Sequence, residues 1–218
     1  IRPKWMIRIG LFLYDLLSSF QNSPYEMKNQ KETLAINRDL KKKDLRGSGV
    51  YHDAIVDDRR LTIEVLRDGA INEKCHALNH VSVTNYYFQD DAIVRVELFD
   101  ELTKTSRTIY CKDLVFATGP FTDLLLSKSE QINWSPQLLP SRGSHIWIDK
   151  KRLNIETAIL LTPNDGRVIF VIPQADRILV GTTESKLEDE YFDLKPSPEE
   201  ITYLLANINQ YFPKANII

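Results

Sequence analysis

The stretch TAILLTPNDGRVIFVIPQADRILVGT, residues 157–182, contains three short apolar runs separated by two turn-forming segments. Each run is rich in β-branched or large apolar residues, which favour strands. The three runs are Thr157–Thr162, Val168–Ile172 and Arg177–Thr182. The intervening segments carry proline, asparagine, aspartate or glycine, which are typical of tight turns. The stretch therefore predicts an antiparallel meander of three strands.

The sequence on both sides of this stretch extends the predicted domain. Before it, Ser144–Ile148 is apolar and β-branched and predicts a further strand. After it, Ser197 is an N-cap residue, Pro198 fits the first helical position and Glu200 completes a capping box. We therefore expect a sheet followed by a helix that runs to about Tyr211.

Residues 50–133 alternate between helical and strand patterns. We expect a helix at 57–67, capped by Asp57 or Asp58 and stopped at Gly69. The strand patterns are Ala77–Thr84, a hairpin of Ile93–Phe99 with Ser106–Cys111, and a short buried strand Leu114–Ala117. The last strand runs into Thr118-Gly119-Pro120 and a helix from about Thr122. This segment is of mixed α/β type.

Residues 5–17 place apolar side chains at helical spacing, with Trp5 and Phe12 among them. A basic, aromatic helix of this kind could lie on a membrane surface, but its high apolar content favours burial in a larger core. The polar residues 18–49 that follow predict a long connection with little helix. The domain organisation is therefore 1–49, a helix and polar connection, then 50–133 and 134–218.

The composition excludes several classes of protein. The chain has 218 residues and 28 basic against 30 acidic side chains, so its net charge of −2 gives no general attraction to nucleic acid. No apolar run reaches the ~18 residues of a membrane span. Two cysteines make no disulfide framework, which indicates a reducing compartment. Only 8 glycines occur, without a G-x-G-x-x-G fingerprint, so a self-contained dinucleotide-binding domain is excluded.

Most candidate chemical motifs have a simpler structural explanation. Cys75, His76 and His80 have no further ligands nearby in the sequence and, on a strand, the histidines lie too far apart for one ion, so we expect no metal site. Asp57-Asp58 is explained by helix capping. Two motifs remain, namely Val115–Pro120, a strand–glycine–helix turn, and Ser141–His145, which places a cation, a glycine and a histidine beside a strand.

Six blocks in order resemble the FAD-dependent glycerol-3-phosphate dehydrogenases of the D-amino-acid-oxidase-like flavoproteins. They are Arg2–Phe12 (RPKWMIRIGLF), Tyr51–Leu61 (YHDAIVDDRRL), Ala117–Pro120 (ATGP), Gly143–His145 (GSH), Val168–Pro173 (VIFVIP) and Gly181–Thr183 (GTT). The departures from the family pattern are mild. They are Phe121 and Gln174 for tryptophan, Arg142 for lysine and Glu184 for aspartate.

The resemblance implies an α/β (α+β) fold in two parts. Residues 50–133 would be the C-terminal part of an FAD-binding domain of the glutathione-reductase-like type. Residues 134–218 would be an antiparallel-sheet substrate domain, with the two interleaved in space. Because the chain opens on Ile1 and lacks the family's glycine-rich loop and phosphate-clamping arginine, we expect an internal fragment that binds FAD weakly and has no turnover.

The resemblance also implies an activity, namely oxidation of glycerol 3-phosphate to dihydroxyacetone phosphate by hydride transfer to FAD. The electrons would pass to a quinone, or to O2 in the related oxidases. We expect no nucleic-acid partner. A homodimer and a cytoplasmic location, at the inner face of the membrane, fit the same resemblance to respiratory enzymes of glycerol metabolism.

By the same resemblance, His145 is the catalytic residue on the substrate side of the flavin. The other substrate-side residues are Arg142, Ser144, Thr182 and Thr183, and the cofactor-binding residues are Val81, Ala117, Thr118 and Gly119. Two alternatives stay open. One is a related FAD-dependent oxidase of an amino acid or another small polar substrate. The other is a non-catalytic module that binds a membrane or a partner through residues 5–17.

Overall fold

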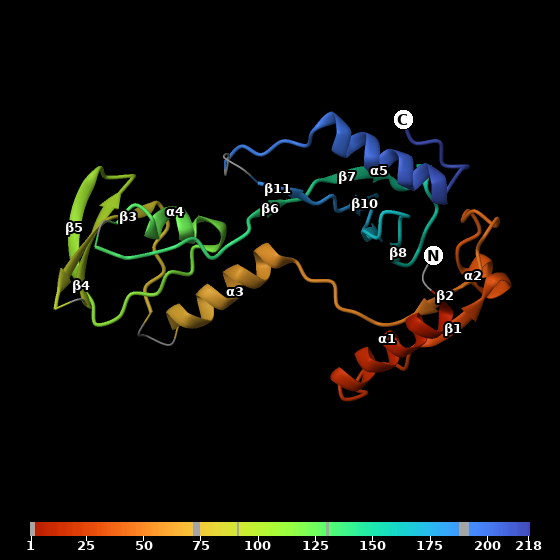
Figure 1. The fold of residues 1–218 in the computed structure, drawn as a ribbon, viewed down its shortest axis with the longest axis horizontal. Coiled ribbons are helices and arrows are strands. Elements are labelled where there is room, and N and C mark those ends of the chain that lie inside the picture. The colour runs from red at the N-terminus through yellow and green to blue at the C-terminus, as the bar shows by residue number, and fades with distance from the viewer. Residues whose placement is uncertain (1–2, 72–74, 91, 130, 188–191) are drawn as a thin grey trace. The chain divides into compact units, whose positions relative to one another are not determined.

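A computed structural model describes residues 3–71, 75–90, 92–129, 131–187 and 192–218 (Figure 1). The chain forms two compact units. One comprises Ile1–Asp53 with Ser127–Ile218, and the other comprises Ala54–Leu126. The fold is of the predicted mixed α/β class with antiparallel sheets. The assignment of 1–49, 50–133 and 134–218 to particular domains stays a prediction.

A four-stranded antiparallel sheet is the centre of the larger unit, in the order β7-β10-β9-β8. Its strands are β7 His145–Asp149, β8 Ile159–Leu161, β9 Ile169–Pro173 and β10 Arg177–Gly181. The meander of β8, β9 and β10 is confirmed, since each strand pairs with the next along the chain. Strand β7 is also confirmed and pairs with the free edge of β10. All of these pairings are antiparallel.

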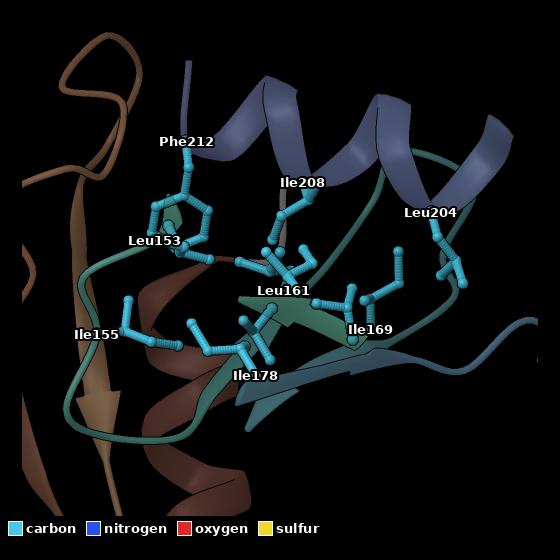
Figure 2. Packing of buried hydrophobic residues seen from close by; sticks show 11 residues of the cluster. Leu153, Ile155, Leu161, Ile169, Ile178, Leu204, Ile208 and Phe212 are labelled. Carbon is cyan, nitrogen blue, oxygen red and sulfur yellow. The ribbon is translucent and has the colours of Figure 1, made fainter. Parts of the chain in front are cut away.

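The hydrophobic core lies between one face of this sheet and helix α5, Pro198–Tyr211. Because side chains alternate along a strand, the buried residues of β9 and β10 point to the same face. They are Ile169, Val171, Ile178 and Val180. From the helix side, Leu204 and Ile208, together with Phe212 just after the helix, are spaced four apart and point toward the sheet (Figure 2). The predicted capping box is confirmed, with Ser197 and Glu200 bonding each other's backbone amides.

A small second sheet brings two connecting segments together. Strand β6, Ser141–Arg142, pairs antiparallel with β11, Ser185–Lys186. Strand β6 leads directly into β7, and β11 follows β10. Residues 141–149 and residues 177–186 therefore pair with each other twice. The first pairing is β6 with β11, and the second is β7 with β10.

The predicted N-terminal helix is confirmed as α1, Lys4–Leu17. Its apolar face is not buried in this chain, because Asp15 is its only buried residue. The prediction of a plain polar connection for 18–49 is wrong. The segment contains β1 Glu26–Asn29, α2 Gln30–Ile36 and β2 Gly47–Val50. None of the helices in the described part of the chain is long and apolar enough to cross a bilayer.

The smaller unit contains the three-stranded antiparallel sheet β3-β4-β5 and helix α3. Its elements are α3 Asp58–Ile71, β3 Val81–Gln89, β4 Ala92–Asp100, β5 Thr105–Tyr110, the 3-10 turn η1 Gly119–Phe121 and α4 Thr122–Leu126. Helix α3 continues through Gly69, since one glycine costs only about 1 kcal/mol in a helix. The hairpin and the start of α4 at Thr122 are confirmed.

Two strand predictions in this unit are wrong in part or in whole. The strand predicted at Ala77–Thr84 begins only at Val81, so His76 and His80 precede it. The buried strand predicted at Leu114–Ala117 is absent from the described residues, and Val115 is 83% exposed. A strand requires a neighbouring strand for its backbone groups, and within the described residues no strand pairs with this segment.

Candidate functional site

The structure brings together four of the five residues that were predicted for the catalytic and substrate side, and it places the fifth, Arg142, beside them on β6 with its guanidinium directed to Lys195 and Glu200. His145 opens β7 and faces Gly181, the last residue of β10. The Ser144 amide donates to Thr183 Oγ1 at 2.8 Å, and the Thr183 amide donates back to the Ser144 carbonyl at 3.3 Å. The motifs Gly143-Ser144-His145 and Gly181-Thr182-Thr183 are therefore two facing segments of the candidate site.

Two glycines allow these segments to approach each other closely. A Cβ at Gly143 would lie 2.1 Å from Thr182 Oγ1 and 2.5 Å from the Thr183 carbonyl oxygen. A Cβ at Gly181 would lie 2.4 Å from His145 Cδ2, so the imidazole lies directly over this glycine. Any larger residue at either position would push the two segments apart.

His145 lies on the sheet face that α5 does not cover. Directly paired residues of an antiparallel sheet point to the same side, so the pairings Gly181–His145, Gly181–Phe170 and Leu160–Phe170 define one row across the sheet. The pairing Leu179–Trp147 defines the next row, where Trp147 is 51% exposed. We call this surface the open face, and its side chains are His145, Trp147, Leu160, Phe170, Ile172 and Leu179. It is an apolar surface with one imidazole at its edge.

A buried carboxylate supports the two segments from behind. Glu200 is 7% exposed. Its Oε2 accepts from the Ser197 amide at 2.8 Å and from Ser144 Oγ at 3.0 Å. Its Oε1 accepts from Ser185 Oγ at 3.1 Å and from Thr183 Oγ1 at 3.2 Å. The Ser197 amide lowers the pKa of Glu200 most, burial opposes this, and Ser144, Ser185 and Arg142 lower it further. The side chain is therefore ionised at neutral pH.

The guanidinium of Arg142 is turned toward the segment that precedes α5. Its Nη1 donates to the Lys195 carbonyl at 3.0 Å, and its Nη2 lies 3.6 Å from Glu200 Oε2. These contacts tie β6 to the start of α5. They also offset part of the charge that Arg142 would present to a substrate anion.

Sequence reasoning missed Ser185 and treated Glu200 only as a capping residue. A signal for Glu200 was present, because it lies four residues before Leu204 and eight before Ile208. These spacings place it on the stripe of α5 that packs into the core. A charged residue on a buried stripe needs partners, which is a reason to look for a buried polar network.

The four residues predicted for the cofactor lie in the smaller unit. Val81 opens β3, while Ala117 and Thr118 lead into η1. The ring of Phe116 packs against Tyr86 of β3, with centroids 5.5 Å apart, so this turn is held beside the sheet. Gly119 has φ +53, and a Cβ there would meet nothing within 4 Å. The turn is therefore open to a close approach, and the role of these residues stays a prediction.

Comparison with known proteins gives a consistent result. The family described as DAO, FAD dependent oxidoreductase, matches residues 3–218. The chain is 33% identical to an aerobic glycerol-3-phosphate dehydrogenase of Bacillus subtilis, over 99% of this chain and 41% of the relative. It is 31% identical to an alpha-glycerophosphate oxidase of Streptococcus pyogenes, over 97% of this chain and 35% of the relative. The chain thus spans less than half the length of these curated relatives.

A solved structure shows the same similarity in three dimensions. It is the glycerol-3-phosphate dehydrogenase from Bacillus halodurans complexed with FAD, which superposes with a TM-score of 0.81 at 32% identity. The superposition covers 88% of this chain and 38% of that chain. The two proteins are therefore similar in both fold and sequence over the matched region.

Proposed function

Since this chain belongs to the DAO family of FAD-dependent oxidoreductases, we propose that the protein oxidises sn-glycerol 3-phosphate to dihydroxyacetone phosphate. The observation that carries the proposal is the facing pair of segments Gly143–His145 and Gly181–Thr183 in a chain about one-third identical to glycerol-3-phosphate dehydrogenases. The substrate in this proposal is inferred from the similar glycerol-3-phosphate dehydrogenases. The geometry of these segments supplies an exposed imidazole beside hydroxyl and amide groups.

The open face has the chemistry that a flavin ring requires on one side. A flavin needs an apolar wall that excludes water, with few polar groups at its edge. Trp147, Phe170 and Leu160 form such a wall, and His145 is the polar group at its edge. For the smaller unit, the proposal that Val81, Ala117, Thr118 and Gly119 contact the nucleotide half of FAD is supported by the family resemblance alone. Bound FAD supplies the hydride acceptor for this chemistry.

In this proposal His145 acts on the hydroxyl at C2 of the substrate. As the hydride leaves C2 with the C–H electron pair, the hydroxyl proton passes to the imidazole and the C2–O bond becomes a carbonyl. Among the remaining substrate-side groups, Arg142 and Thr182 would orient the substrate, while Ser144 and Thr183, which are 8% and 2% exposed, would position His145. A histidine suits this task because the unprotonated nitrogen of a neutral imidazole can accept a proton.

The electron acceptor and the location are further parts of the proposal. We propose a quinone as acceptor, with O2 as the alternative suggested by the similar oxidases. A quinone acceptor would bring the protein to the cytoplasmic face of the membrane as a peripheral protein. A reducing compartment, inferred from the presence of only two cysteines, is part of the same proposal. A homodimer is also part of the proposal.

The substrate proposal predicts selective flavin reduction under anaerobic conditions. The FAD-loaded whole protein is mixed with sn-glycerol 3-phosphate, with glycerol, or with glycine and proline as amino-acid substrates. We expect bleaching of the flavin absorbance by glycerol 3-phosphate alone, because only this compound carries both the secondary alcohol and the phosphate. Bleaching by an amino acid and not by glycerol 3-phosphate would replace the proposal with an amino-acid oxidase.

We also predict that the 218-residue chain purified by itself carries little FAD and has no turnover. It contains 8 glycines and no G-x-G-x-x-G loop, the element whose backbone amides hold the pyrophosphate of a dinucleotide. The measurement is the ratio of flavin to protein absorbance after gel filtration in the presence of FAD. A stoichiometric flavin content would contradict the prediction.

A further inference from the structure

The buried carboxylate of Glu200 connects helix α5 with both segments that flank His145. We propose that Glu200 is a positioning residue, which holds Ser144-His145 against Gly181–Thr183 in the geometry that the reaction needs. The inference rests on the proposed role of His145. It goes beyond that role by assigning a function to a residue that does not face the open side of the sheet.

The place of Glu200 in α5 makes its hydrogen-bond partners obligatory. Glu200, Leu204, Ile208 and Phe212 follow one another at intervals of four residues and are all buried. An ionised side chain at this depth is stable only when its oxygens are fully paired. Each carboxylate oxygen accepts two hydrogen bonds, and the donors come from three separate segments of chain. The carboxylate is therefore a cross-link between α5, the start of β7 and the end of β10.

The contacts reach His145 through the hydroxyl of Thr183. This hydroxyl donates its only hydrogen to Glu200 Oε1 and accepts the amide hydrogen of Ser144 at 2.8 Å. Glu200 thereby determines the direction of the Thr183 hydroxyl. Ser144 is held twice, because its own hydroxyl also donates to Glu200 at 3.0 Å. Since His145 follows Ser144 directly, these bonds fix the backbone from which the imidazole projects over Gly181.

Helix capping alone does not explain this arrangement. A capping box requires one oxygen of Glu200 to bond the Ser197 amide. The bonds from Ser144, Thr183 and Ser185 are additional. The neighbouring Glu199 lies in the same first turn and is exposed, so it supplies negative charge to the same helix end from the solvent side. Glu199 is therefore the matched control.

The first test measures the cross-link in the whole protein by amide hydrogen exchange. Glu200→Gln keeps the shape and one capping oxygen but replaces an acceptor oxygen with an NH2 donor. Thr183→Val removes the bridging hydroxyl at nearly constant volume. We expect faster exchange of the Ser144 amide in both variants, and unchanged exchange in Glu199→Gln and Thr183→Ser. Equal exchange in Glu200→Gln and Glu199→Gln would overturn the inference.

The second test measures flavin reduction by glycerol 3-phosphate in a single turnover of the FAD-loaded whole protein. A misplacement of a catalytic group by about 1 Å can lower a rate by about 100-fold. For Glu200→Gln we expect a loss of about 10- to 100-fold. Because Thr183 and Glu200 act in one chain of bonds, the double variant should lose little more than either single variant. A merely structural role would lower the amplitude, through loss of folded protein, and leave the rate constant unchanged.

The outcomes separate this inference from the proposed function. Faster amide exchange in Glu200→Gln with an unchanged rate constant would overturn the positioning role and leave the function intact. If His145→Gln itself leaves the rate constant unchanged, the proposed role of His145 fails, and the inference that rests on it fails as well. A fall in the rate constant for His145→Gln and Glu200→Gln, but not for Glu199→Gln, supports both.

Discussion

Replacing His145 with glutamine is expected to lower the rate constant of flavin reduction by glycerol 3-phosphate by about 10²- to 10⁴-fold, the usual contribution of a general acid or base. His145 is exposed at the edge of the open face. Its ring lies over Gly181, which has no side chain. Glutamine can still form a hydrogen bond to a substrate hydroxyl but cannot accept its proton. The loss should therefore affect reduction more than substrate binding.

The measurement is anaerobic single-turnover bleaching of the flavin at several substrate concentrations, which separates the rate constant from the apparent affinity. His76→Gln is the control, since His76 is also exposed but precedes β3 in the other unit. An unchanged rate constant in His145→Gln would return His145 to a purely structural role. An equal loss in His145→Gln and His76→Gln would mean that the effect does not depend on the position of His145, which would contradict the prediction.

The elements that sequence reasoning predicted well are those with strong local signals. The meander of β8, β9 and β10 has dense apolar runs and clear turn residues, and α5 has a cap, an N1 proline and an apolar stripe. Strands β1 and β2 were missed because they contain few apolar residues. Their pairing depends on Gly47, where φ is +135 and a Cβ would lie 2.2 Å from the Lys28 carbonyl oxygen. Such a close contact between backbones leaves no hydrophobic pattern in the sequence.

In the candidate site, too, sequence reasoning found local motifs and missed contacts between distant residues. Gly143–His145 was found from its residue types and Gly181–Thr183 only through the family resemblance, and the structure places the two segments opposite each other. Their support was not found, because the partners of Glu200 come from residues 144, 183 and 185, far from it in sequence. The sequence contained one half of the evidence, a glutamate on a buried stripe. The other half, the hydroxyls that satisfy it, depends on how β7 and β10 pack beneath α5.

The second large effect is expected on stability, from the same stripe of α5. Leu204→Ala should lower the free energy of unfolding of the larger unit by about 2–5 kcal/mol, the range for truncating a buried leucine. Leu204 is 0% exposed and lies in the cluster that joins α5 to β9 and β10 (Figure 2). Since domains are stable by only about 5–15 kcal/mol, this is a large fraction of the total.

Leu139→Ala is the matched control, because it removes the same atoms from a side chain that is 78% exposed. We expect it to change stability by less than about 0.5 kcal/mol, as surface substitutions usually do. The measurement is urea unfolding followed by circular dichroism. If α5 were only loosely attached to the sheet, the two variants would unfold at the same urea concentration. That result would also remove the basis for Glu200 as a cross-link, since its carboxylate reaches β7 and β10 only while Leu204, one turn further along, remains packed against the sheet.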